Sequence, residues 1–487
     1  MSAPAAFPAS FVRPWKELLA SHQAEQANDF PNHHVSNLDS LMTTSSLKSL
    51  HVGTGYSIYT RALLPAILAA KHSVHFVTCY WAASPTLDAI HDVLVQLASA
   101  RRPREDGSPP LRIAIGFSSR GLFQKLFHTS SRHGYIYSPS QWGKLGLPDD
   151  AMLRSRGIEL TVKSLFFTPL SVMHPKYVIV DGQTAFVPSC NVSWERWFEG
   201  CVELEGDAVQ TLLAFHEKVW GTGPDPEATL DGYRQGRQQK KDDATGEALG
   251  PVAGDTTRTR TDDVSSAQSI QLDYSEAVPT IVLPSPHHRN PRFSFFPFLS
   301  QSDPPMTPLN AALLTLFANA RRKITILTPN VTSGAAVEAL LKALDRGVDV
   351  QIRTSKNMML IEQLVTAGTT TSRCIGKLVN EYKKLQSRTQ ASDLEAQPVP
   401  PGKLEILYFK PLMGREESED EPVVSHFKMT FVDDEYLMLG SGNMDRASWW
   451  TSQELGILFY VPGFHGHALW DKVLERRTEV VFQSRDH

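Results

Sequence analysis

The sequence predicts an α/β protein made of two similar domains, each with a mixed β-sheet flanked by helices and the two related by a pseudo-twofold axis. Three observations lead to this prediction. Short apolar runs alternate with helical segments, which is typical of layered α/β sheets. The alternation occurs twice, on either side of a polar stretch. At 487 residues the chain also exceeds what one hydrophobic core usually supports.

The first half contains one complete set of these elements. A helix-forming segment leads into an apolar run at Val74–Thr78, which predicts a buried strand. A helix is expected over Leu87–Ala98, and a polar loop then leads to a second strand at Leu111–Phe117. This order predicts one helix-and-strand layer.

The second half repeats that order. An apolar helical segment precedes a strand expected at Ile324–Leu327, and a helix follows over Ala335–Leu344. The turn at 345–347 contains a glycine and leads into a strand at Val348–Arg353.

The spacing of equivalent features indicates a duplication. A distance of 250 residues separates Val74 from Ile324, and 252 residues separate His174 from His426. Two features that lie about a hundred residues apart within each half therefore keep nearly the same spacing, as an internal repeat requires.

Composition suggests the domain boundaries. We predict an N-terminal tail at residues 1–45, a first domain at 46–220, a flexible linker at 221–290 and a second domain at 291–487. The linker has few large apolar residues, so it cannot bury enough surface to offset the entropy of ordering it. Two shorter stretches, 387–402 and the acidic run 414–422, are predicted to be solvated loops for the same reason.

Charge and cysteine content narrow the protein class. A net charge of −4 gives no overall attraction to phosphate backbones, although a local basic cleft is compatible with it. The four cysteines form no CxxC pair, which indicates free thiols in a reducing compartment. No apolar run approaches the length of a membrane span. We expect a cytoplasmic protein that can bind a membrane surface peripherally, with mitochondrial targeting by the acid-poor N-terminus as a weaker alternative. The oligomeric state is not readable from the sequence.

The main chemical signal is a motif that occurs twice. In each copy a His is followed two residues later by Lys and five residues after that by Asp, and a Ser-x-Asn segment starts eight residues beyond the Asp. The first copy comprises His174, Lys176, Asp181, Ser189 and Asn191, and the second comprises His426, Lys428, Asp433, Ser441 and Asn443. One copy alone would be a weak signal, but two copies at identical spacing within a repeat are specific.

These residue types suit phosphodiester chemistry. His and Lys two positions apart share one face of a strand, so both can point into one cleft. Lysines can neutralise the phosphate charge while Ser and Asn donate hydrogen bonds, so we predict neither a metal nor another cofactor. One imidazole can attack phosphorus while the other protonates the leaving oxygen. Asp181 and Asp433 are predicted to hold the turn after each motif strand.

With these motifs the chain resembles the phospholipase D superfamily, whose members combine two such motifs from two similar domains. The segments 197–206 and 443–454 are most similar to bacterial cardiolipin synthases and related phosphatidyltransferases. The resemblance covers about residues 50–220 and 305–480. It implies a phosphodiesterase that works through a phosphohistidine intermediate.

The resemblance also suggests the acidic partners of the histidines. A nucleophilic His needs an acidic group on its other ring nitrogen to fix its tautomer. Glu454, eleven residues after Asn443, matches that position, and Glu199 is its counterpart eight residues after Asn191. By the same resemblance His174 is favoured as the nucleophile, with the second motif histidine as the alternative.

The first copy departs from the family pattern. Pro188 replaces the usual Gly, and Cys190 lies between Ser and Asn, which could narrow the pocket or leave this half degenerate. The tryptophans just beyond the motifs could equally line a substrate mouth or pack in the core. They are Trp194, Trp197, Trp449 and Trp450.

Three functions remain open at this point. The leading one is cleavage or transfer of a phospholipid headgroup or phosphatidyl group, with a phospholipid as substrate and a membrane surface as partner. The first alternative is a nuclease of the same superfamily, which should show a basic groove and aromatic side chains for base stacking. The second is a catalytically silent scaffold or binding protein.

Overall fold

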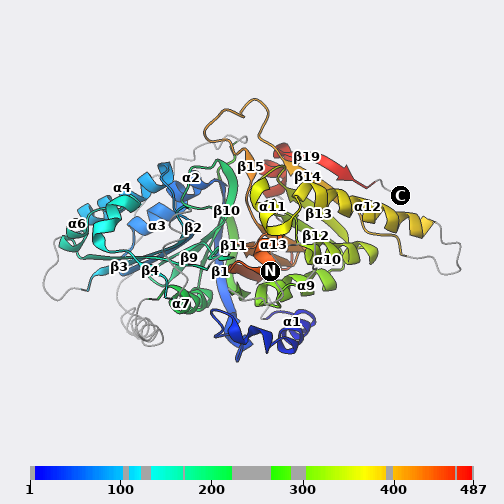
Figure 1. Ribbon diagram of the computed structural model, residues 1–487, viewed down its shortest axis with the longest axis horizontal. Coiled ribbons are helices and arrows are strands. Elements are labelled where there is room, and N and C mark those ends of the chain that lie inside the picture. The colour runs from blue at the N-terminus through cyan, green and yellow to red at the C-terminus, as the bar shows by residue number, and fades with distance from the viewer. Residues whose placement is uncertain are drawn as a thin grey trace.

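The structure is a computed structural model that describes residues 6–101, 109–121, 133–167, 171–221, 265–286, 303–390, 399–464, 466 and 469–484. It has the predicted α/β architecture. The strands lie in the middle of the molecule, with helices of the first half on one side and helices of the second half on the other (Figure 1).

The elements of the first repeat follow the predicted order. They are β1 (Met42–Thr54), α2 (Gly55–Ile58), α3 (Leu64–Leu68), β2 (Ser73–Tyr80), α4 (Pro85–Ala100), β3 (Leu111–Ser119), β4 (Tyr135–Ile136), α6 (Asp150–Ser155), β5 (Ile158–Ser164), β6 (Phe166–Phe167), β7 (Ser171–Val172), β8 (Tyr177–Val180), β9 (Thr184–Pro188), β10 (Trp197–Glu205) and α7 (Asp207–Trp220). The strands and the helix predicted around residues 74–117 are confirmed as β2, α4 and β3.

The second repeat has the corresponding elements. They are β11 (Gln268–Ser285), α9 (Pro308–Asn319), β12 (Lys323–Leu327), α10 (Gly334–Asp345), β13 (Asp349–Thr354), α11 (Leu360–Ala367), α12 (Thr371–Gln390), β14 (Leu404–Phe409), β15 (Val424–Ser425), β16 (Met429–Val432), β17 (Tyr436–Gly440), α13 (Arg446–Trp450), β18 (Glu454–Tyr460) and β19 (Thr478–Gln483). The predicted turn before β13 places Gly347 at φ 88°, a conformation that favours glycine.

The two repeats pair their strands in the same way. In the first, β2, β3 and β5 are parallel neighbours, and β8, β9, β10 and β1 follow β2 in antiparallel order. In the second, β12, β13 and β14 are parallel, and β16, β17, β18 and β11 follow β12 in antiparallel order. The pseudo-twofold axis itself stays a prediction.

The sheets of the two repeats are joined into one. Strand β1 pairs antiparallel with β11, for example Leu50 with Ile270 and Thr43 with Thr280. Each of these strands would otherwise be the unpaired edge of its own sheet, and an exposed edge is costly. The result, in the part of the chain that the structure describes, is a single 17-stranded sheet where two separate sheets were expected.

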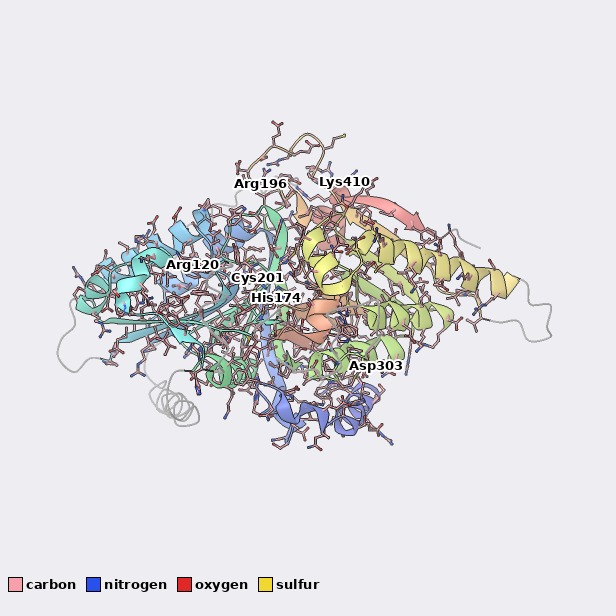
Figure 2. The ribbon with its side chains drawn as sticks, viewed as in Figure 1. Arg120, His174, Arg196, Cys201, Asp303 and Lys410 are labelled. Carbon is pink, nitrogen blue, oxygen red and sulfur yellow. The ribbon has the colours of Figure 1, made fainter. Side chains whose placement is uncertain are left out.

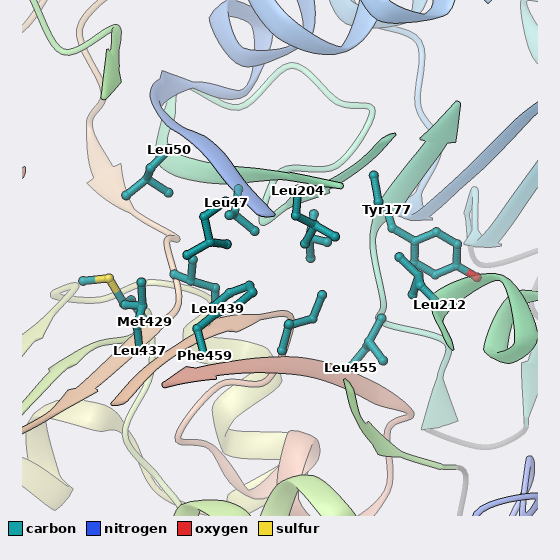
Figure 3. Packing of buried hydrophobic residues seen from close by; sticks show 14 of the residues in the cluster. Leu47, Leu50, Tyr177, Leu204, Leu212, Met429, Leu437, Leu439, Leu455 and Phe459 are labelled. Carbon is teal, nitrogen blue, oxygen red and sulfur yellow. The ribbon is translucent and has the colours of Figure 1, made fainter. Parts of the chain in front are cut away.

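Three apolar clusters hold these layers together. One lies under the helices of the first repeat, around α3, α4 and β3, and another lies under the helices of the second repeat, around α9, α10 and β13. The third contains residues of both repeats, and Figure 3 shows Leu47 of the first repeat beside Leu439 of the second. The two halves therefore share a core, which fixes their relative position.

Part of the segment 1–45, which was predicted to be an N-terminal tail, forms a packed helix. Residues 9–21 form helix α1 (Ala9–Ser21), which packs on α9. Phe11, Trp15 and Leu19, spaced four apart, are buried on one face of α1, and the indole N–H of Trp15 donates to Pro308 O at 3.1 Å. The Ala/Pro-rich composition concealed this apolar stripe of helical period.

Two other predicted loops are shorter than expected. The linker assigned to 221–290 contains β11 at 268–285, and the rest of it, 222–264 and 287–290, lies outside the described residues. Residues 387–390 belong to α12, and 391–398 lie outside the described part. The acidic run is not solvated throughout, because Glu421 is fully buried against Arg477. Within the described parts of the chain, no helix combines the length and apolar character that crossing a bilayer requires.

Candidate active site

Each motif histidine lies in an extended segment between two short strands. His174 follows β7 and Lys176 precedes β8, while His426 follows β15 and Lys428 precedes β16. Backbone bonds from the opposite repeat hold both segments, because the amide of His174 donates to Gln453 O at 3.0 Å and the amide of His426 donates to Phe198 O at 2.8 Å. The repeat contact therefore positions both histidines.

A serine at the end of a parallel strand supports each segment. Ser118, at the end of β3, accepts the amide of Met173 at 2.9 Å, one residue before His174. Ser355, just after β13, accepts the amide of Ser425 at 3.0 Å, one residue before His426. The sequence analysis missed this pair, although Ser118 and Ser355 lie one and two residues after the predicted strands.

Each histidine has a carboxylate partner from the other repeat. The Nδ1 of His174 lies 2.8 Å from Glu454 Oε2, and the Nδ1 of His426 lies 2.8 Å from Glu199 Oε1. Both carboxylates are buried, so each directs its histidine through the Nδ1–H. The Nε2 of each ring is then the nitrogen left for chemistry.

The motif serines hold these carboxylates. Ser441 Oγ donates to Glu454 Oε2 at 2.5 Å and accepts the amide of Leu455 at 3.0 Å. Ser189 Oγ donates to Glu199 and accepts the amide of Gly200 at 3.0 Å. The hydrogen-bond pattern is the same in both repeats. Both hydroxyl protons are directed at a carboxylate, so the predicted role of these serines in substrate binding stays a proposal.

The first repeat keeps this arrangement despite Pro188. Pro188 pairs with Cys201 in the β9–β10 ladder, and the neighbouring Ser189 keeps its bonds to β10. Cys190 is buried, and a Cβ added to Gly55 would lie 3.1 Å from the Cys190 Cβ. The close approach of Gly55 therefore makes room for the cysteine, and the residues that differ from the pattern do not displace Ser189.

Both lysines are buried beside the histidines. Lys176 Nζ donates to His174 O at 2.8 Å, and Lys428 Nζ donates to His426 O at 2.6 Å. Lys428 Nζ also lies 2.8 Å from both ring nitrogens of His426. Each lysine lowers the pKa of both histidines, so the two motifs form one cluster of charges. Figure 2 places His174 where the two halves meet.

Burial dominates the electrostatics of this cluster. It lowers the pKa of His426 to about 3 against the opposing effect of Glu199, and it lowers the pKa of Lys428 to about 7. Burial also lowers the pKa of His174. Burial alone would raise the pKa of Glu199, but His426, Lys428 and Ser189 together lower it. Both histidines are therefore neutral at neutral pH in the empty site, and Glu199 is ionised.

The motif aspartates bind backbone amides away from the histidines. Asp181 accepts the amides of Lys71, His72 and Ser73 at 2.7 to 3.2 Å. Asp433 accepts those of Arg321, Arg322 and Lys323 at 2.8 to 3.0 Å. These contacts fix the start of β2 and of β12 next to the motif strand, and the role predicted for both aspartates in the turn after that strand stays a prediction.

The two asparagines differ in their contacts. Asn191 Oδ1 accepts the amide of Tyr80 at 3.2 Å, which ties the first Ser-x-Asn segment to β2. Asn443 Nδ2 donates to Asp445 Oδ2 at 2.9 Å, and its buried Oδ1 has no hydrogen-bond partner in the described part of the chain. Of the two, Asn443 has the polar atom that remains open to a ligand.

Of the tryptophans beyond the motifs, two lie near the site and two pack in the core. The Trp197 ring lies 4.7 Å from the His426 ring, and the Trp194 side chain is 58% exposed. Trp449 and Trp450 are buried in the core of the second repeat. Only the first pair is therefore available to shape a substrate mouth.

One group among the described residues has metal-ligand chemistry, and neither motif histidine belongs to it. His75, His216 and Glu217 are buried between β2 and α7, with ligand atoms within 4.8 Å of one another. The Tyr177 hydroxyl lies 3.1 Å from His216 Nδ1, and Lys163 interacts electrostatically with Glu217. Burial lowers the pKa of His75 to about 4.

One known sequence family matches the second repeat. Residues 313–471 match the sequence family described as cardiolipin synthase, PLD-like domain. This stretch includes the second motif and Glu454 and excludes the first motif. No curated protein matches the chain.

Solved structures share the architecture at low sequence identity. The chain is similar to phosphatidylserine synthase from Haemophilus influenzae Rd KW20, with a TM-score of 0.52 and 14% identity over 92% of this chain and 91% of that one. The phospholipase D family member Nuc from Salmonella typhimurium gives a TM-score of 0.26 and 15% identity over 42% of this chain and 98% of that one. Polyphosphate kinase from Porphyromonas gingivalis gives a TM-score of 0.35 and 10% identity over 84% of this chain and 47% of that one. At such identity the first similarity shows the fold alone, and together with the family match it confirms the predicted resemblance.

Proposed function

We propose that this chain is an enzyme of the phospholipase D type that transfers the phosphatidyl group of a phospholipid to water or to an acceptor alcohol through a phosphohistidine intermediate. The observation that carries the proposal is the pair of buried histidines, each held by a carboxylate from the other repeat through Nδ1. Two neutral imidazoles, each with its carboxylate on Nδ1 and not on Nε2, and two neighbouring lysines suit a double displacement at phosphorus.

His174 is the proposed nucleophile. Its side chain is 13% exposed and that of His426 is 3% exposed, so a phosphate that enters from solvent reaches His174 more readily. As His174 Nε2 bonds to phosphorus, the bond from phosphorus to the headgroup oxygen breaks. The lysine charges offset the negative charge that builds on the phosphoryl oxygens.

His426 is the proposed acid and base. It gives a proton to the departing oxygen, then takes one from water or an alcohol whose oxygen attacks phosphorus as the P–N bond breaks. In the empty site the pKa of His426 is about 3, so the negative charge of bound substrate must raise it. Solvent supplies that proton when substrate binds, and Lys428, 2.8 Å from both ring nitrogens, keeps its own proton and its charge.

A phospholipid is the substrate that the similarities favour. The matched family is described as cardiolipin synthase, and the solved structure that shares the fold over most of its length is named a phosphatidylserine synthase. The intact contacts of Ser189 and Glu199 count against a degenerate first repeat, and so against a silent scaffold.

A substrate panel tests the proposal. Purified protein in EDTA is incubated with phosphatidylcholine, with phosphatidylglycerol plus an acceptor alcohol, and with single-stranded DNA. His174→Ala and His426→Ala should each lower lipid turnover by at least about a hundredfold, whereas His91→Ala, a surface histidine, should not. Cleavage of DNA alone would favour the nuclease, and no turnover of any substrate would favour the scaffold.

The covalent step has a separate test. Phosphoramidates survive in base, so a base quench during turnover followed by peptide mass spectrometry should locate the adduct on His174. An adduct on His426 would reverse the two roles. Inversion of configuration at phosphorus would rule out the double displacement, which retains configuration.

A further inference from the structure

Helix α11 exposes an unusual amount of apolar surface. Leu360, Ile361, Leu364 and Val365 are 38%, 81%, 48% and 56% exposed. Their spacing places them on one face of the helix. Single exposed apolar residues are common on protein surfaces, but four large ones together mark a site of interaction.

The polarity of α11 is inverted. Gln363, on the opposite face, is buried, and its amide donates to Asn330 Oδ1 at 2.9 Å and accepts the amide of Thr371 at 2.6 Å. At the end of the helix, Arg446 Nη1 donates to Thr366 O at 2.8 Å. These bonds fix the rotation of α11, so the helix cannot turn its apolar face inward without leaving buried polar groups unpaired.

This helix adjoins the candidate active site at both ends. It begins five residues after Ser355, whose hydroxyl binds the backbone of Ser425 directly before His426. Its last turn is tied to Arg446, three residues after Asn443, and α11 packs on α13 (Figure 1). A surface that contacts α11 therefore also lies close to Ser355 and Arg446, which adjoin the segments that contain His426 and Asn443.

The charges around α11 favour an anionic partner. Lys356 lies four residues before α11, and Arg373 and Lys377 lie in α12, which begins four residues after α11 ends. All three are exposed, and Glu362 is the one acidic residue between positions 356 and 377. This segment is therefore positive within a chain whose net charge is −4. An apolar helix face flanked by cations is the pattern of helices that lie in a membrane interface, where cations meet phosphate groups.

We infer that α11 docks the protein on a phospholipid surface, with its apolar face among the acyl chains and the flanking cations among the headgroups. The inference rests on the proposed function. A diacyl phospholipid is held in a bilayer, and a docked α11 brings the His174 and His426 site to the headgroups without extraction of the lipid.

Vesicle flotation tests the inference. Full-length protein is mixed with vesicles of phosphatidylglycerol and phosphatidylcholine, and binding is compared between wild type, Ile361→Ser/Val365→Ser and the control Val480→Ser/Val481→Ser. The control removes two exposed valines from β19. The α11 variant should bind vesicles at least about tenfold more weakly than wild type, and the control should bind like wild type. Circular dichroism and thermal unfolding check that both variants fold.

Two outcomes would overturn the inference. One is equal vesicle binding by wild type and the α11 variant, including no binding by either. The other is a wild-type dimer that the α11 variant converts to monomer, since α11 would then be a self-association surface. If the proposed function is wrong but the inference is right, vesicle binding will depend on α11 although no phosphodiester is cleaved. Turnover of a short-chain, water-soluble lipid isolates the chemistry, because the α11 variant should match wild type there.

Discussion

The Nδ1 of His174 in the first repeat lies 2.8 Å from the Glu454 carboxylate in the second. In the same way, the Nδ1 of His426 in the second repeat lies 2.8 Å from the Glu199 carboxylate in the first. Each repeat therefore supplies the carboxylate partner for the motif histidine of the other repeat. Neither repeat holds a finished catalytic pair alone, so the shared core and the β1–β11 ladder are requirements of the chemistry as well as of stability.

Glu454→Gln should lower kcat by about 10²- to 10⁴-fold with little change in KM. The amide is close in size, but it no longer offers a negative charge to the imidazole, so the required tautomer and the developing positive charge are less favoured. Glu199→Gln should act similarly through His426. Steady-state kinetics on a water-soluble phosphodiester measure the effect. The exposed Glu475→Gln is the control, and kcat equal to that of the control would exclude the proposed role.

The rate should fall as pH rises through about 7. Burial lowers the pKa of Lys428 to about 7, so the amine is charged below that pH and neutral above it, and only the charged form neutralises phosphate. Burial also lowers the pKa of His174, so the acidic limb should lie below the ordinary histidine value.

The measurement is kcat/KM against pH at constant ionic strength, which reports the free enzyme. Lys428→Arg keeps a permanent charge, so it should lose the alkaline limb even if the maximal rate drops. An alkaline limb that is unchanged in Lys428→Arg would assign it to another group.

Local pattern predicted the strands, the helices and the motif residues, because each depends on neighbours within about twenty positions. The cross-repeat pairing of Glu199 and Glu454 was not predictable in this way. Glu454 lies eleven residues after Asn443 and Glu199 lies eight residues after Asn191, and the longer of these two segments contains α13. Which carboxylate meets which histidine is a property of how the repeats pack.

The misplaced boundaries have a related cause. Strand β11 contains many polar residues, such as Gln271 and Ser269, and composition therefore assigned it to a linker. It is ordered because it has a partner on both sides, β1 and β18, and those partners lie far away in the sequence. The acidic loop likewise contains one buried carboxylate, whose partner Arg477 is 56 residues further along the chain.

Asp433→Asn should destabilise the fold by about 1–3 kcal/mol. The carboxylate accepts three backbone amides at the start of β12, and the neutral amide loses the charge that strengthens these bonds. Asp434→Asn is the control, because its half-exposed ion pair with Arg322 at 3.4 Å contributes little. Urea unfolding measures both. Activity per folded molecule should be retained, and a large loss of kcat in fully folded Asp433→Asn would give this residue a catalytic role.

Glu421→Gln should cost about 3–5 kcal/mol, because it leaves the Arg477 guanidinium buried without its counter-ion. Arg477 Nε and Nη2 each donate to Glu421 at 2.8 Å, and both side chains are almost fully buried. Glu421 Oε1 also accepts the amide of Leu412 at 2.8 Å, so the pair closes the acidic loop that leads to His426. Thermal and urea unfolding should separate this variant from the exposed Glu419→Gln, which should stay within about 0.5 kcal/mol of wild type. Replacing both partners, as in Glu421→Leu/Arg477→Met, should recover much of the loss because no unpaired charge remains. Equal stability of Glu421→Gln and Glu419→Gln would mean that the buried pair does not anchor the loop.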